Sequence, residues 1–487
     1  MRKIDLQFVK ERYIYIYAYI YLFISIVLFL LGNVKYVFSI PITIILIVGL
    51  VKSIKNSPKM TVSLLKSKKM IIILCLIIFW TFISGIGGFV WQNTWDHKFR
   101  NALFNDLVRY SWPVIQNSKA LCYYLGFWLP SALVGKIFNL EIGYLFQTFW
   151  AILGISITFG IICQHLKKIK ISNMILMIFF SGLDIFLYLI FSGLSIRESF
   201  NGIINGSHLE LVTQYFNSSS NTTLMFWLYN QIIPFWVGIM LILQQENRKS
   251  IVFIYSLLLI FSPFPLVALI PVLVYLIFKD YEGDKKYDTL WMSMWEKIKS
   301  TCTYENVISI FLFVIVGLFF LSNIAVGEIN ILNINITIVF KYLCYIFFEY
   351  IVYLVFIYKK NDRNPILNIL IITTFVLPFI CLGTSYDFAW RTCIPLSFYI
   401  MLLIMKTFQD SDVNKKTKIF LIIILCLGAI TPLTEIIRTV KNEVLVIKGD
   451  IKARSDSLTS IFEKEFNECY ENFIGETDSL FYKYISK

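Results

Sequence analysis

The sequence predicts an all-α fold, a polytopic transmembrane helical bundle of about 11–13 spans with interfacial helices in its first large extracytoplasmic loop. Of 487 residues, 57% are hydrophobic and only 15% are charged, against roughly 25% charged residues in an ordinary soluble domain. Stretches such as 13–31, 70–89 and 306–325 carry about 20 residues with almost no charge, the length that crosses about 30 Å of hydrocarbon as a helix. The apolar runs are continuous rather than alternating, which argues against a membrane β-barrel.

Thirteen apolar segments are expected to span the membrane: 13–31, 36–51, 70–89, 141–163, 172–193, 223–243, 250–262, 265–279, 306–325, 336–358, 365–383, 393–406 and 418–434. The first run follows the charged start Met1-Arg2-Lys3, but it lacks a small-residue cleavage site, so we expect it to be retained. The pair around Ser262-Pro263-Phe264-Pro265 is short on both sides and forms either two tight helices or a protein-shielded re-entrant hairpin.

Charge asymmetry predicts the orientation of these spans. Lysines and arginines concentrate at the N-terminus and in the segments 52–69, 164–171, 244–249, 280–305, 359–364 and 407–417. The positive-inside rule therefore predicts a multi-pass protein of the cell (plasma) membrane with a cytoplasmic N-terminus. The net charge of +13 follows from this asymmetry and from attraction to anionic lipid, so we expect no nucleic-acid partner.

The chain divides into three regions. Residues 1–69 hold two spans and a basic cytoplasmic loop. Residues 70–434 form the transmembrane core, with extracytoplasmic loops 90–140 and 194–222. Residues 435–487 are mixed in charge and only mildly apolar, which predicts a small extracytoplasmic helical tail that does not fold alone.

The segment 121–138 is apolar enough to be a span, but counting it as one would place the basic run His165–Lys170 outside the cell. We therefore expect a helix at the outer interface, with Trp128 and the Tyr123-Tyr124 pair at the level of the headgroups.

The first extracytoplasmic loop contains the strongest candidate for chemistry. It is expected to form an interfacial helix that begins near Asp96 and has an apolar stripe made of Phe99, Leu103, Leu107 and Tyr110. A carboxylate at a membrane surface, beside His97 and Lys98, suits a base that deprotonates an acceptor hydroxyl while a lipid phosphate leaves. The alternative is structural: Asp96 caps the helix, and Asp106 pairs with Arg109 one turn on.

Three further sites have both a functional and a structural interpretation. His208 and Glu210 in the second loop suit proton transfer or metal binding, or are solvated loop residues. Asp184 falls inside an apolar span, where it either faces a cavity or partner or holds two helices together. Arg391 either holds a lipid phosphate through its fixed donor fork or pairs with Asp387 as a surface bridge.

Together, the loop that begins Trp95-Asp96-His97-Lys98 and the segment 123–136 (YYLGFWLPSALVGK) resemble the C superfamily (GT-C) of membrane glycosyltransferases. More narrowly, six segments look like a group of bacterial multi-span membrane proteins with the same layout: Phe180–Asp184, His208–Glu210, Ser219–Trp227, Asn230-Gln231, Phe261–Phe264 and Asp387–Arg391. The resemblance covers about residues 70 to 406.

The resemblance implies an enzyme that takes a sugar from a polyprenyl-phosphate donor at the outer face of the membrane and passes it to a glycan, lipid or protein acceptor. It implies that Asp96 is the catalytic base, and the residues for the donor phosphate are Arg391, His97 and Lys98. The second acidic or proton-transfer group is Asp106, His208 or Glu210. Some relatives use a divalent metal ion and some do not. The alternatives are a polysaccharide-repeat polymerase or ligase, and a lipid or glycan transporter without chemistry.

Overall fold

The structure is a computed structural model that describes residues 6–65, 67–93, 95–286, 289–327, 329–361, 363–382, 386–463 and 470–487. Its first eleven helices are α1 (Leu6–Asn33), α2 (Tyr36–Lys55), α3 (Lys68–Ile83), α4 (Asp96–Arg109), α5 (Leu129–Ile137), α6 (Leu140–His165), α7 (Ile171–Phe179), α8 (Asp184–Phe191), α9 (Ile196–Asn205), α10 (Asn221–Trp227) and α11 (Tyr229–Leu243). The remaining helices are α12 (Ile251–Leu258), α13 (Pro263–Phe278), α14 (Leu290–Thr301), α15 (Tyr304–Leu321), α16 (Ile336–Ile346), α17 (Val352–Asn361), α18 (Pro365–Val376), α19 (Asp387–Thr392), α20 (Ile394–Gln409), α21 (Lys415–Gly428) and α22 (Ile430–Lys448).

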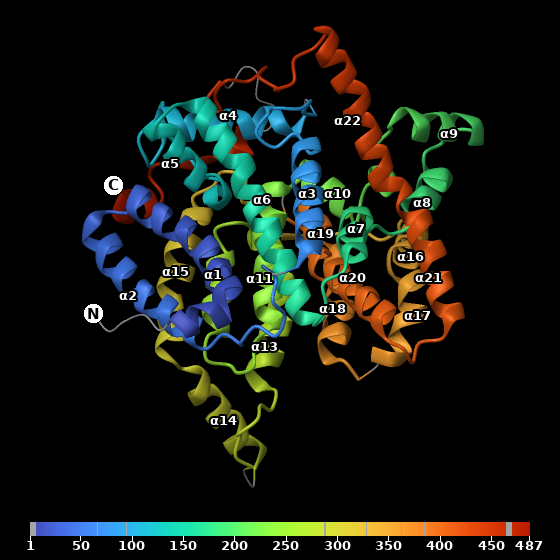
Figure 1. Ribbon diagram of the computed structural model, residues 1–487. Helices are drawn as coiled ribbons and strands as arrows, with labels where there is room; N and C mark the ends of the chain where they lie inside the picture. The colour runs from blue at the N-terminus through green and yellow to red at the C-terminus, as the bar shows by residue number, and fades with distance from the viewer. Residues whose placement is uncertain are drawn as a thin grey trace.

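The helices form the predicted all-α polytopic bundle (Figure 1). Among the described residues, eight helical segments are long and apolar enough to cross a membrane, and three further apolar helices are shorter. Each of the thirteen predicted spans contains at least one helix. The uncertain pair at 250–279 forms two helices, α12 and α13, with Pro263 in the first turn of α13, where its missing N–H costs nothing.

Strands are few and short. Strands β1 (Ile115–Gln116), β2 (Lys119–Leu121) and β5 (Ile474–Glu476) form one antiparallel sheet in the order β1-β2-β5. Strands β3 (Ile329–Ile331) and β4 (Ile380–Leu382) form a second antiparallel pair. The first sheet joins the loop after α4 to the C-terminal region of the chain.

The centre of the bundle consists of helices that are apolar on every side, as expected for spans enclosed by protein. Nearly every residue of α11 and α20 is buried, and α6 packs against α1, α5 and α11. The indole ring of Trp236 on α11 stacks between Trp80 of α3 and Phe398 of α20, with ring centroids 5.8 Å and 6.0 Å away.

The first large loop differs from the prediction. Nine of the fourteen residues of α4 are buried, because α5 and α6 lie on one side of it and the C-terminal region covers another. The side-chain amide of Asn101 donates to the carbonyl of Ser455, and the backbone N–H of Ile461 donates to Asp106. α4 is therefore a packed helix rather than one with a solvated charged face. The segment 121–138 is likewise not one interfacial helix: it comprises the end of β2, a short 3₁₀ turn and α5.

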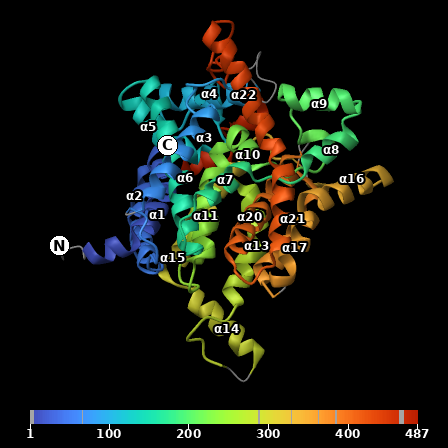
Figure 2. The same ribbon diagram turned by 45° about the vertical axis from the view of Figure 1, so that its right-hand side comes forward.

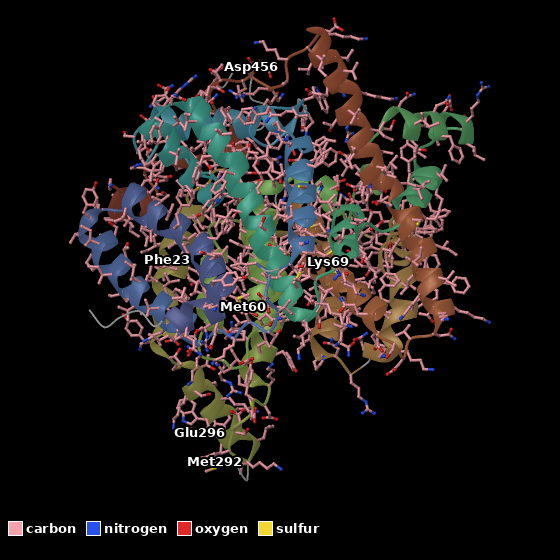
Figure 3. The ribbon with its side chains drawn as sticks, in the orientation of Figure 1. Phe23, Met60, Lys69, Met292, Glu296 and Asp456 are labelled. Carbon is pink, nitrogen blue, oxygen red and sulfur yellow. The ribbon has the colours of Figure 1, made fainter. Side chains whose placement is uncertain are left out.

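The bundle has two distinct ends. Figures 1 and 2 show α4, α9 and the end of α22 at one end, and α14 at the other. Figure 3 shows Asp456 at the first, called here the α4 end, and Met292 and Glu296 at the second, called the α14 end. Loops 90–140 and 194–222 thus lie at the same end, as they must if both are on the same side of the membrane.

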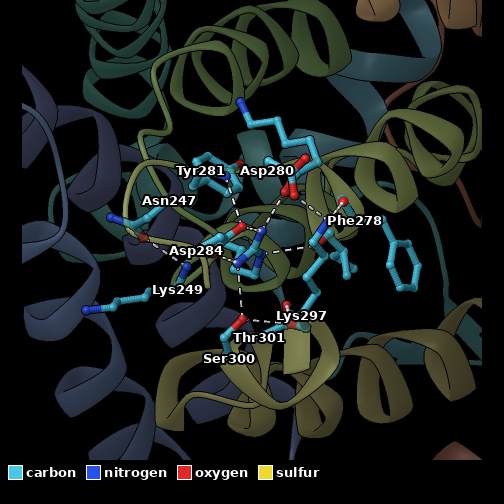
Figure 4. Close-up of polar contacts among 12 residues, drawn as sticks. Asn247, Lys249, Phe278, Asp280, Tyr281, Asp284, Lys297, Ser300 and Thr301 are labelled. Atoms are coloured by element: carbon cyan, nitrogen blue, oxygen red, sulfur yellow. Dashed lines mark hydrogen bonds and ion pairs between the residues drawn. The ribbon is translucent and has the colours of Figure 1, made fainter. Parts of the chain in front are cut away.

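A polar network fixes the connection between α13 and α14. Arg248 is buried and donates to Asp284 through both terminal nitrogens, to Ser300 on α14 and to the carbonyl of Ile277 on α13. Figure 4 shows Asp284 and Ser300 converging on this point. The guanidinium beside it lowers the pKa of Asp284 to about 2, because the ionised carboxylate accepts two charge-assisted hydrogen bonds.

Candidate functional site

Asp96 is the first residue of α4. The structural role predicted for it, a helix cap, does not apply: the preceding N-cap residue is Trp95, and no side chain caps the helix. The Asp96 carboxylate lies 3.1 Å from the Nη2 atom of Arg100 one turn on, and its backbone N–H donates to Asn93. A negative charge at a helix N-terminus is favoured by the helix dipole, and the Arg100 pair adds to this.

Two other predicted site residues, Arg391 and His208, lie near Asp96, although the three are far apart in the sequence. Its side chain is 30% exposed, yet burial by the surrounding chain is the main cause that raises its pKa. The charges of Arg100, Arg391 and His208 oppose that rise, and the charge of Asp387 adds to it. Asp96, Arg391 and His208 therefore lie within electrostatic range of one another at the α4 end.

Arg391 is held on the short helix α19. Its guanidinium is 9% exposed and lies 2.6 Å from the carboxylate of Asp387, the predicted i,i+4 pair. The hydroxyls of Tyr123 and Tyr124 lie within electrostatic range of it. Its Nε atom and the Nη1 atom of Arg100 are both buried and have no hydrogen-bond partner among the described residues. Unsatisfied guanidinium donors are rare in proteins, so two of them near one carboxylate suit an anion.

His208 is not a solvated loop residue. Its Nδ1 atom lies 2.9 Å from the carboxylate of Glu435 on α22, and the indole N–H of Trp227 donates to the same carboxylate at 2.9 Å. Arg438 also pairs with Glu435. Burial alone would lower the pKa of His208, but the hydrogen bond to Glu435 and the charges of Glu435 and Glu210 outweigh it, so the pKa is raised.

Glu210 and Asp184 lie deeper, behind His208. Glu210 accepts a 2.9 Å hydrogen bond from the backbone N–H of Ser220, and burial raises its pKa to about 8. Asp184 is 1% exposed and accepts a 2.7 Å hydrogen bond from the hydroxyl of Ser181. It is the first residue of α8, because the predicted span 172–193 is interrupted between α7 and α8.

The remaining candidates point away from this group. Asp106 is fully buried under the C-terminal region, where it accepts from the N–H of Ile461, and burial raises its pKa to about 6. The buried ring of His97 bonds the carbonyl of Phe226 at 3.0 Å, and burial lowers its pKa to about 3. The ammonium group of Lys98 lies over the rings of Trp95 and Phe99. In these positions Asp106 and His97 stabilise the loop.

The sequence interpretation missed three charged residues: Glu349, Glu435 and Arg438. Glu349 sits inside the apolar span 336–358, so the rule that selected Asp184 would have found it. Glu435 and Arg438 were assigned to the mixed-charge tail, where nothing local distinguishes them from solvated residues. No cluster of three or more His, Cys, Asp or Glu able to hold a metal ion occurs within the described ranges.

Comparison of the chain with models of known protein families, with curated proteins and with solved structures finds no match.

Proposed function

We propose that this chain is a membrane glycosyltransferase of the C-superfamily type, which moves a sugar from a polyprenyl-phosphate donor to a cell-envelope acceptor at the outer face of the plasma membrane. One observation carries the proposal. The partly accessible carboxylate of Asp96 lies near the buried guanidinium groups of Arg100 and Arg391, whose donors are not all satisfied.

In this reaction Asp96 accepts the proton of the acceptor hydroxyl, and the hydroxyl oxygen forms a bond to the anomeric carbon of the sugar. The bond between that carbon and the phosphate oxygen breaks, and the polyprenyl phosphate leaves with the bonding electrons. The raised pKa of Asp96 makes its carboxylate a better proton acceptor than an exposed one. Arg391 and Arg100 then stabilise the charge that develops on the leaving phosphate.

The orientation belongs to the same proposal. With the N-terminus in the cytoplasm, the basic segments lie at the α14 end and the Asp96 group faces the outside, where polyprenyl-linked sugars react. The neighbouring His208–Glu435 pair supplies a second group that exchanges protons close to the reacting atoms.

The test measures sugar transfer from a polyprenyl-phosphate donor by the purified chain in lipid vesicles. Asp96→Asn keeps the size of the side chain but removes the base, so we expect transfer to fall by about 10²–10⁴-fold with unchanged folding. Asp456→Asn is the matched control, because Asp456 lies at the same end and its ion pair is with the exposed Lys452. Full transfer by Asp96→Asn would refute the proposal, and movement of the lipid across the membrane without transfer would favour a transporter.

A further inference from the structure

Two of the spans are interrupted where they face each other. Residues 180–183 are not helical and separate α7 from α8, and a π-helical turn, Phe347–Ile351, separates α16 from α17. The backbone N–H of Leu183 in the first break donates to the carbonyl of Phe348 in the second at 3.0 Å. Breaks of this kind inside spans are tolerated where they are enclosed by protein, and they often mark functional sites.

Each break contributes one buried carboxyl group. Asp184 begins α8, and Glu349 lies in the π-helical turn; they are 1% and 4% exposed. The two carboxyl groups lie within hydrogen-bonding range of each other. A Cβ atom at position 182 would overlap the Glu349 carboxylate, so a residue larger than Gly182 would have to displace that carboxylate. Two carboxyl groups in hydrogen-bond contact cannot both be ionised without a cation between them, so a proton or another cation must be present.

The surrounding charges do not neutralise this pair. Glu210 lies within electrostatic range of both carboxyl groups and adds a third acidic group. The cation that faces Asp184 and Glu210 is His208, but His208 is paired with Glu435, as is Arg438. An uncompensated carboxylate inside a membrane costs several kcal/mol, so these acids must gain positive charge from another source.

A small cavity borders the Glu349 member of the pair. It has room for about one water molecule, about 10 Å³, and its wall includes Glu349, Ser181, Ser218 and Ser397. The hydroxyls of Ser218 and Ser397 are 2.8 Å apart. The Oε1 atom of Glu349 is buried and has no hydrogen-bond partner among the described residues. The thiol of Cys393 and the hydroxyls of Tyr345, Tyr350 and Tyr353 are further titratable groups near Glu349. A dehydrated Na⁺ ion or a water that carries a proton matches this cavity in size and in oxygen-rich lining.

We propose that Asp184, Glu349 and the serine-lined cavity form a binding site for one exchangeable monovalent cation, a proton or a Na⁺ ion. Glu210 and His208 connect this site to the Asp96 group at the α4 end, through which the cation exchanges with solvent. The proposal of this cation site does not depend on sugar transfer, so it is independent of the proposed function.

Infrared difference spectroscopy of the wild-type protein in lipid vesicles tests the proton. We expect C=O stretches of protonated carboxyl groups at neutral pH. Glu210 contributes to them because burial raises its pKa, so the component that belongs to Asp184 and Glu349 is the one that shifts in Asp184→Asn and in Glu349→Gln and is lost when both are replaced. Glu305→Gln is the matched control, since Glu305 is equally buried in α15 but accepts hydrogen bonds from Asn56 and Ser250. The control should keep the band. A spectrum that stays unchanged in both variants and in the double variant would overturn the proton assignment.

Binding of radioactive sodium to the wild-type protein tests the alternative occupant and does not require any variant to fold. If Na⁺ is the occupant, one equivalent of sodium binds and raises the melting temperature above that measured in choline chloride. The affinity for sodium falls as the pH is lowered. A protonated-carboxyl band that does not depend on Asp184 or Glu349, together with no sodium binding by the wild-type protein, would overturn the proposal, whatever the outcome for sugar transfer.

Discussion

The Nδ1 atom of His208 lies 2.9 Å from the Oε1 atom of Glu435, so the loop between α8 and α10 is tied to the last helix of the bundle. The Glu435 side chain is 2% exposed and also accepts from Trp227. This pair thus links residues more than 200 positions apart in the chain, and His208 is within electrostatic range of both Asp96 and the carboxyl groups of Asp184 and Glu210.

His208→Gln should destabilise the protein by about 1–3 kcal/mol at pH 6, because it leaves Glu435 short of a charged partner. The pKa of His208 is raised in the folded protein, so its stabilising effect is complete below the ordinary value of 6.5 and is lost as the pH rises through the folded pKa. Thermal unfolding in detergent should show the two proteins converging at alkaline pH. A difference that grows with pH would contradict the ion pair.

Asp106 should make attachment of the C-terminal region sensitive to pH. Its folded pKa of about 6 exceeds the ordinary value of 3.8, so the stability it supports is present below pH 3.8 and is lost as the pH rises to about 6. Asp106→Asn keeps an acceptor for the N–H of Ile461 but does not titrate, so the variant should gain relative stability over this range, by up to about 3 kcal/mol. Protease protection of residues 449–463 as a function of pH measures this gain in stability. Identical protection profiles for the variant and the wild type would argue against a buried, titrating Asp106.

Arg391 should contribute to donor binding through the shape of its donor group as well as its charge. Arg391→Lys keeps the charge but loses the planar fork, so we expect binding of polyprenyl phosphate to weaken about 10-fold, and Arg391→Gln to weaken it further. Arg197, on the exposed helix α9, provides the control substitution Arg197→Lys. Binding to lipid vesicles with labelled polyprenyl phosphate is the measurement. Equal affinity of all three variants and the wild type would exclude Arg391 from the donor site.

The spans could be predicted from the sequence because a long uncharged run specifies a membrane helix locally. The helix that begins at Asp96 was predicted from a different local signal, the helical spacing of its apolar residues. The covering of α4 by residues 453–461 could not be predicted, because contacts between residues more than 350 positions apart leave no local signal. The pairing of Asp184 with Glu349 depends likewise on two helix breaks that meet only in the folded bundle.

The central claim is that the α4 end, with Asp96, faces the outside of the cell. Single cysteines at Trp95 and Met292, which are 51% and 55% exposed at opposite ends, test it in a background in which Cys469 and the exposed cysteines among the described residues, Cys75, Cys302 and Cys426, are serine. A membrane-impermeant thiol reagent applied to intact cells should label Trp95→Cys, and should label Met292→Cys only after permeabilisation. Labelling of Met292→Cys alone in intact cells would place Asp96 on the cytoplasmic side and contradict the proposed reaction.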